Sequence, residues 1–160
     1  MLKTGDKAPY FEGHDQDGNL IKLSDFAGRK LVLYFYPKDN TPGCTAEACD
    51  LRDNYRRFLA EGYSVVGVSR DSAASHKKFA AKYSLPFPLI SDPDLAVLKA
   101  YEAYGEKKMY GKTVTGTLRK TYVIDADGTI FDIISKVDTK AHSSQILSDT
   151  AEINAASGRR

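Results

Sequence analysis

The chain has 160 residues, 42% hydrophobic side chains and a formal net charge of +2, values typical of one compact domain with a full hydrophobic core. No apolar run approaches the roughly 20 residues that a membrane span requires, so no membrane insertion is expected. Lysine and arginine are interleaved with aspartate and glutamate throughout. Without a basic stripe to follow phosphates, the chain is not expected to bind nucleic acid.

The N-terminal part of the chain indicates the cellular location and the first strands and helix. Residues 1–6 lack the apolar segment of a secretory signal, so a cytoplasmic location is expected. Residues 20–23 predict a small peripheral hairpin. The continuous apolar run 31–36 is typical of a strand buried on both faces of a parallel sheet. A turn-rich loop is expected over 37–43, and a helix over 45–59, where apolar residues recur at helical spacing.

The middle of the chain continues the alternation of strands and helices. Residues 63–69 predict a second buried strand, and residues 72–83 predict a polar-faced helix that Ser72 is suited to cap. A short strand is expected over 88–91 and a short helix over 94–101.

The C-terminal part begins with a polar, glycine-containing stretch over 104–116, which predicts a long loop. Strands are expected over 118–124 and 129–134, because Asp-Ala-Asp-Gly at 125–128 is a strong hairpin signal. A closing helix is expected over 143–155.

The order of these elements predicts an α/β fold with three α/β/α layers around a mixed central sheet. This is the layout of the thioredoxin fold, extended here by the N-terminal β-hairpin. We expect a single domain over residues 1–156 and a flexible tail over 157–160.

The two cysteines, Cys44 and Cys49, lie in one short segment. A reducing compartment disfavours a structural disulfide, so such a pair is redox-active, binds metal or packs in the core. Zinc needs four ligands, and His14, His76 and His142 show no paired spacing. A structural metal site is therefore not expected.

The position of Cys44 relative to the helix start favours reactivity. Thr41 has the character of an N-cap and Pro42 suits the first helical position, which places Cys44 at the third. A thiolate there would face unpaired backbone N–H groups, the positive end of the helix dipole and the Thr41 hydroxyl. The alternative is that Cys44 is an inert side chain in the first turn, and that Cys49 is a buried core residue.

Residues 34–53 closely resemble the peroxiredoxins, and in particular their bacterioferritin comigratory protein, or peroxiredoxin Q, branch. The shared signature Pro-x-x-x-Thr-x-x-Cys is matched by Pro37, Thr41 and Cys44. Cys49 matches the resolving cysteine that the branch carries in the same helix. Other segments agree with this resemblance, which extends over nearly the whole chain: residues 5–9, 106–112 and 119–125.

The resemblance implies a thiol peroxidase that takes hydrogen peroxide and organic hydroperoxides. The Cys44 thiolate would attack the peroxide and become a sulfenic acid, while Arg119 and Thr41 donate hydrogen bonds to thiolate and peroxide. Pro37 would shield the thiolate from water. Cys49 would then form a disulfide with Cys44, which thioredoxin or a similar dithiol protein would reduce.

The same resemblance implies neither a cofactor nor a metal, because sulfur carries out the redox chemistry. A resolving cysteine on the same helix requires no second subunit, so a monomer is expected. Two other functions remain open from the sequence. A thioredoxin-like disulfide reductase would use the same fold but prefers Cys-x-x-Cys, and a peroxide sensor or holdase would use the same cysteine for signalling or for binding partners.

Overall fold

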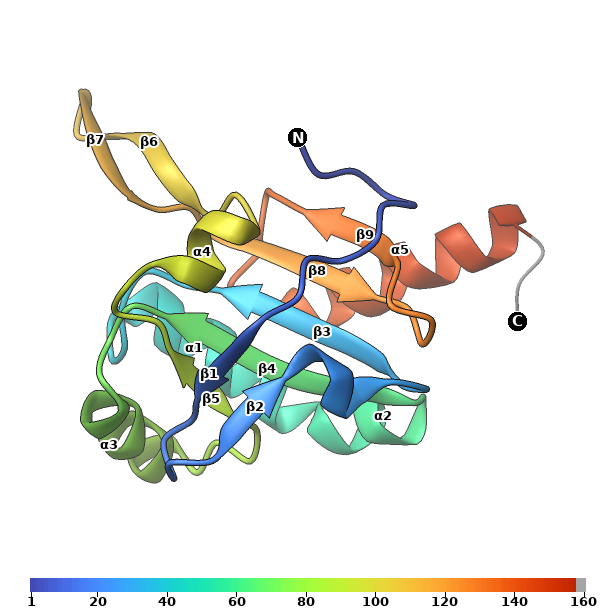
Figure 1. Cartoon of the computed structure of the whole chain (residues 1–160), viewed down its shortest axis with the longest axis horizontal. Helices are drawn as coiled ribbons and strands as arrows, with labels where there is room; N and C mark the ends of the chain where they lie inside the picture. The colour runs from blue at the N-terminus through green and yellow to red at the C-terminus, as the bar shows by residue number, and fades with distance from the viewer. Residues whose placement is uncertain (158–160) are drawn as a thin grey trace.

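The computed structural model describes residues 1–157 and is built on a seven-stranded mixed sheet (Figure 1). The strand order is β2-β1-β5-β4-β3-β8-β9. These strands are β1 (Glu12–His14), β2 (Leu20–Lys22), β3 (Lys30–Phe35), β4 (Tyr63–Ser69), β5 (Leu89–Ser91), β8 (Lys120–Ile124) and β9 (Ile130–Ile134). The predicted α/β architecture with a mixed central sheet is confirmed, and so is the N-terminal hairpin, which β1 and β2 form.

The central strand β3 shows why the sheet needs cover on both faces. It pairs in parallel with β4 and antiparallel with β8, and its side chains alternate between two hydrophobic cores. Val32 and Tyr34 face one core, whereas Leu31 and Leu33 face the other, and all four are fully buried. A continuous apolar run is therefore required here, because neither face of the strand meets water.

The helices divide unequally between the two faces. Side chains of α1, α2, α3 and α5 enter the core that contains Val32, whereas α4 and the N-terminal segment cover the other face (Figure 1). The bounds are η1, a 3₁₀ helix (Leu23–Phe26), α1 (Pro42–Asp53), α2 (Tyr55–Ala60), α3 (Ala73–Tyr83), α4 (Ala96–Ala100) and α5 (His142–Ser157). Ser72 caps α3 as predicted, with its side chain accepting a hydrogen bond from the Ser75 N–H.

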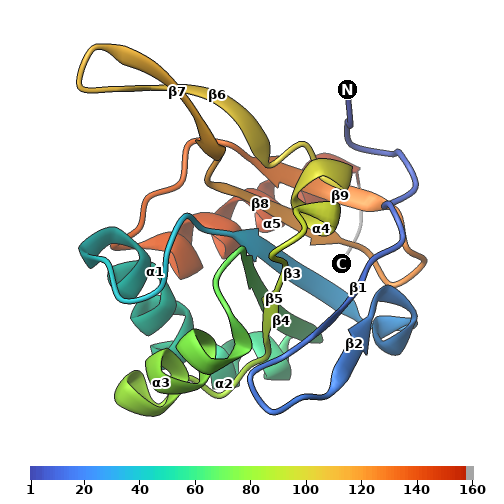
Figure 2. The same ribbon diagram turned by 60° about the vertical axis from the view of Figure 1, so that its left-hand side comes forward.

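The prediction of a long loop over 104–116 is wrong. This stretch forms a second, two-stranded sheet from β6 (Tyr104–Met109) and β7 (Lys112–Thr117), which projects from the body of the molecule (Figure 2). The turn between the strands is Tyr110-Gly111, and both residues have positive φ, of 52° and 76°. Two left-handed residues are what a tight hairpin turn requires. The hairpin escaped the sequence analysis because both of its strands are largely polar and show no apolar alternation.

The helix expected over 45–59 is divided in two. It begins earlier, at Pro42, and breaks at Asn54, which separates α1 from α2. The Asn54 side chain donates to the Asp50 carbonyl at 2.9 Å, in competition with the backbone bonding that would continue one helix. The helix predicted over 94–101 is also shorter, because Leu95 has a left-handed φ of 64° before α4 begins.

The seven-stranded sheet lies between the two cores, and one domain over residues 1–156 stays a prediction. Of the tail predicted over 157–160, Ser157 is the last residue of α5, and residues 158–160 lie outside the described residues. Among residues 1–157, none of the helices has both the length and the apolar character needed to cross a bilayer.

Candidate active site

Cys44 lies where the sequence predicted it, in the first turn of α1. The chain leaves β3, passes through the loop 36–41 and enters the helix at Pro42, with Thr41 as the N-cap in an extended conformation (Figure 2). Cys44 is thus the third helical residue, and only 1% of its surface is exposed. A helix N-terminus presents unpaired N–H groups and a positive dipole end, both of which favour a thiolate.

The Arg119 guanidinium is the second part of the site. Its Nη2 donates to Cys44 Sγ at 3.3 Å, and its Nη1 donates to Glu47 Oε1 at 2.6 Å. A Cβ at Gly43 would lie 3.5 Å from Nη2, so the guanidinium lies against the first turn of α1. A fixed cation at this distance stabilises negative charge on sulfur.

Arg119 lies just before β8, which begins at Lys120 rather than at residue 118 as predicted. Its side chain is 23% exposed, whereas that of its partner Glu47 is fully buried. Burial alone would lower the pKa of Arg119, but the charges of Glu47 and Cys44 outweigh it and raise that pKa. The guanidinium therefore stays charged between its two partners.

Glu47 is the site residue that the sequence analysis missed. Burial raises its pKa to about 7, although the nearby Arg119 charge works to lower it. Among the described residues, Oε2 of Glu47 makes no hydrogen bond, and it lies 3.5 Å from Nε2 of His142. A signal was present in the sequence, because Glu47 follows Cys44 by three positions and so shares its face of the helix.

His142, the first residue of α5, closes the inner side of this cluster. Its Nδ1 lies 2.8 Å from Gln145 Oε1 and its Nε2 lies 2.7 Å from the Thr121 hydroxyl. Burial lowers the pKa of His142, so the neutral ring donates from Nδ1 and accepts from Thr121 at Nε2. Nε2 therefore carries no proton, and its lone pair accepts from the Thr121 hydroxyl. It can form no further hydrogen bond with the second oxygen of Glu47.

One residue of the predicted set, Thr41, does not bond to the thiol. The Thr41 hydroxyl donates to the Lys38 carbonyl at 2.9 Å, and none of the hydrogen bonds of the described residues joins it to Cys44. Within residues 1–157 the expected contact between this hydroxyl and the thiolate is therefore not made, because the hydroxyl donates to the loop carbonyl instead. Pro37 lies half-buried at a bend of the same loop.

Cys49 lies in the same helix as Cys44, and both thiols are free. Cys49 is half-buried, whereas Cys44 is buried. The structure therefore describes a reduced protein in which α1 is continuous from Pro42 to Asp53.

A family model described as the AhpC/TSA family matches residues 4–133 of the chain. Peroxiredoxin Bcp of Escherichia coli K12 is 43% identical over 146 residues, which cover 91% of this chain and 94% of that protein. Peroxiredoxin Bcp of Bacillus subtilis 168 is 42% identical over 146 residues, with 91% and 93% covered.

Solved structures of related proteins are also similar to this chain. The bacterioferritin comigratory protein of Xanthomonas campestris, described for its alkyl peroxide reduction activity, superposes with a TM-score of 0.86 at 36% identity, covering 94% of this chain and 98% of that one. The peroxidoxin BcpB of Mycobacterium tuberculosis superposes with a TM-score of 0.83 at 35% identity, covering 96% and 99%.

The raised pKa of Glu47 predicts a pH-dependent cost to stability. In the unfolded chain the carboxyl loses its proton near its ordinary value of 4.5, whereas in the folded protein it does so at about 7. Wild type should therefore lose free energy of unfolding relative to Glu47→Gln as pH rises from 4.5 through 7. The expected loss is on the order of 1–3 kcal/mol.

Chemical denaturation of both proteins at pH 5 and pH 8 measures this difference. The control is Glu61→Gln, which changes an exposed glutamate paired with Arg57 and should give no such pH-dependent difference. A gap between wild type and Glu47→Gln that is the same at both pH values would show that Glu47 ionises as readily in the folded protein as in the unfolded chain.

Proposed function

The chain belongs to the AhpC/TSA family, in the Bcp branch of the peroxiredoxins, and from this premise we propose that Cys44 is the cysteine with which it reduces hydroperoxides. The protein is a thiol peroxidase. The observation that carries the assignment of Cys44 is the 3.3 Å hydrogen bond from Arg119 Nη2 to its Sγ at the N-terminus of a helix.

In the chemical step, the Cys44 thiolate attacks one oxygen of the peroxide and the O–O bond breaks. Sulfur becomes a sulfenic acid, and the departing oxygen takes a proton and leaves as water or an alcohol. Arg119 has five N–H donors in a rigid plane, so it can hold both the thiolate and the oxygen on which charge develops. Glu47 fixes the orientation of the guanidinium by accepting a 2.6 Å hydrogen bond from Nη1 of Arg119. Thr41 and Pro37 complete the proposed site through the conformation of the loop.

The substrates that we propose are hydrogen peroxide and organic hydroperoxides. The relative from Xanthomonas campestris is described for alkyl peroxide reduction, which supports the organic class. The sulfenic acid then condenses with the Cys49 thiol, forming an S–S bond and releasing water. Thioredoxin or a similar dithiol protein returns both cysteines to thiols, a cycle suited to a monomer in the reducing cytoplasm.

The disulfide cannot form in the helix as it stands. Two residues five apart in a regular helix have Cα atoms roughly 8–9 Å apart, on faces about 140° apart. A disulfide needs Cα atoms within about 7 Å and converging side chains. Since Cys44 and Cys49 both lie in the unbroken α1, at least the first turn and a half must unwind after the sulfenic acid forms.

The C-terminal limit of this unwinding is set by contacts between α1 and α5. The Asp50 carboxylate accepts from the Ser143 N–H at 2.6 Å, and the Asp50 carbonyl accepts from the Ser143 hydroxyl at 3.1 Å. At the other end the helix is weak, because Gly43 is a poor helix former and the terminal turn frays readily. We therefore place the unwound segment between residues 42 and 50.

The assignment of the two cysteines predicts different failures in their serine variants. Cys44→Ser should abolish peroxide reduction, because a serine hydroxyl stays protonated at neutral pH. Cys49→Ser should react once with peroxide and then stop as a sulfenic acid that drifts to over-oxidised forms. Peroxide consumption with thioredoxin and intact-mass analysis measure both outcomes. Substantial turnover by Cys44→Ser would refute the proposed function, and loss of thioredoxin-coupled turnover in wild type would favour a sensor.

Arg119→Ala should slow oxidation of Cys44 by about 10²–10³, the usual cost of removing one donor from such a site. Stopped-flow oxidation with hydrogen peroxide measures the rate. Arg56→Ala is the control, since Arg56 is an exposed arginine of α2. A wild-type rate in Arg119→Ala would assign Arg119 a purely structural role.

Amide hydrogen exchange tests the unwinding. In the oxidised protein, exchange should quicken over residues 42–50 and stay slow at the start of α5, where Ser143 is held by Asp50. Reduced protein serves as the reference. A protein shown by mass spectrometry to contain the Cys44–Cys49 bond, yet protected over residues 42–50, would contradict this mechanism.

A further inference from the structure

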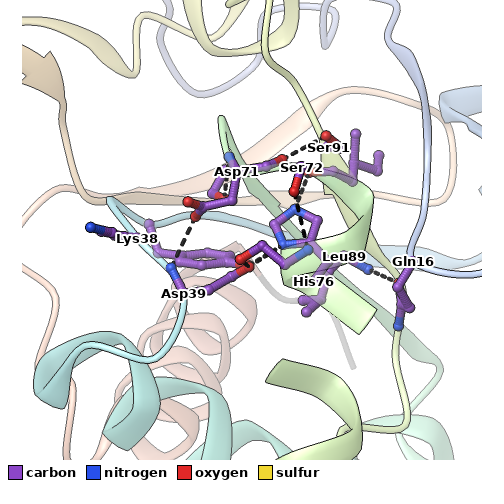
Figure 3. Close-up of polar contacts among 12 residues, drawn as sticks. Gln16, Lys38, Asp39, Asp71, Ser72, His76, Leu89 and Ser91 are labelled. Carbon is purple, nitrogen blue, oxygen red and sulfur yellow. Dashed lines mark hydrogen bonds and ion pairs between the residues drawn. The ribbon is translucent and has the colours of Figure 1, made fainter. Parts of the chain in front are cut away.

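A second buried polar cluster lies next to the active-site loop, and the mechanism above does not use it (Figure 3). At its centre is Asp39, which is 7% exposed and lies two residues before Thr41. The Asp39 carboxylate accepts from the Tyr36 hydroxyl at 2.6 Å, from the Ser75 hydroxyl at 2.8 Å and from His76 Nδ1 at 2.6 Å. With so many donors directed at it, the carboxylate is held as an acceptor.

His76 lies on α3 and is fully buried. Its Nε2 lies 3.0 Å from the Ile90 carbonyl, an acceptor, so this nitrogen carries a proton. Its Nδ1 faces the Asp39 carboxylate, which also accepts. Both ring nitrogens are thus engaged, and the ring joins the active-site loop to β5.

Asp71 fixes the backbone of the loop in the same cluster. Its Oδ2 accepts from the Asp39 N–H at 2.9 Å and from the Ser69 hydroxyl at 2.7 Å, and its carbonyl accepts from the Ser91 hydroxyl at 2.6 Å. Asp39, Asp71 and His76 present ligand atoms within 4.8 Å of one another, as a metal site would. These atoms are already bonded to protein donors, so the cluster is built to hold the loop.

The active site depends on this attachment because the first turn of α1 has little support of its own. Thr41 makes no side-chain capping bond, and Gly43 occupies the second helical position. Between Asp39 and Thr41, Asn40 has a left-handed φ of 59°, a conformation that its neighbours must maintain. If the loop relaxed, the N-cap and the first turn would move, and Cys44 would shift relative to Arg119.

We propose that His76 and Asp39 are positioning residues for the peroxidase reaction: their buried pair fixes the loop 36–41, and thereby holds the first turn of α1 with Cys44 in register with Arg119. The inference rests on the proposed role of Cys44. The pair is buried, and buried polar pairs of this kind add little net stability compared with apolar side chains. The attachment of the loop that leads to Cys44 explains why this buried position holds a polar pair rather than apolar side chains.

The test uses the Cys49→Ser protein as parent, in which Cys44 is the remaining thiol. His76→Ala and Asp39→Asn are introduced into this parent. In each, oxidation of Cys44 by hydrogen peroxide should fall roughly 10- to 100-fold, the range expected when a reacting group is misplaced by about 1 Å. His76→Gln, whose amide can still donate to Asp39, should recover part of the rate.

Two further variants keep the outcome interpretable. Ser75→Ala removes one donor to Asp39 from a less buried position and should slow oxidation by a smaller factor, which tests the inference if His76→Ala does not fold. His14→Gln changes an exposed histidine and should match the parent. Folded His76→Ala or Asp39→Asn with the parent's oxidation rate would overturn the inference. An unreactive parent would instead refute the role of Cys44.

Discussion

A guanidinium held between a buried carboxyl and a buried thiol is the interaction on which the chemistry of this protein depends. Arg119 directly precedes β8, whereas Cys44 and Glu47 lie one turn apart on α1. A single side chain thus joins the segment before this sheet strand to the helix at the reacting atom. The bond to Glu47 orients the guanidinium, and the second nitrogen is then fixed toward sulfur. Glu47 has a cost of its own, because burial makes its ionised form unfavourable.

The helix that activates Cys44 is also the obstacle to closing the disulfide. Activation needs a formed N-terminus, with its free N–H groups and dipole directed at sulfur, whereas the disulfide needs that turn undone. The protein places its firm contacts at the two ends of the segment that must move. Asp39 fixes the loop before the segment and Asp50 fixes the helix after it, so unwinding between them leaves the rest of the core intact.

The sequence predicted the reacting centre well because its determinants are local. Thr41 and Pro42 set the helix start and hence the position of Cys44, and buried strands follow from continuous apolar runs. Glu47 was missed because its spacing of three residues from Cys44 marks a shared helix face but not burial, which results from the approach of Arg119 and His142 from distant parts of the chain. The direction of the Thr41 hydroxyl and the hairpin β6–β7 could not be predicted either. Each depends on a backbone conformation that the polar sequence does not specify.

An aromatic layer connects the two polar clusters that flank α1. Tyr34 and Tyr36 stack with ring centroids 5.4 Å apart, and the Tyr36 hydroxyl donates to Asp39. Burial raises the pKa of Tyr34 well above its usual value, with the charges of Glu47, Cys44 and Asp39 adding to the effect. The hydroxyl therefore stays protonated, and the layer brings no competing negative charge near the thiol. Only 1% of the Cys44 surface is exposed, so solvent screens its interaction with Arg119 less than it would screen a pair on the surface.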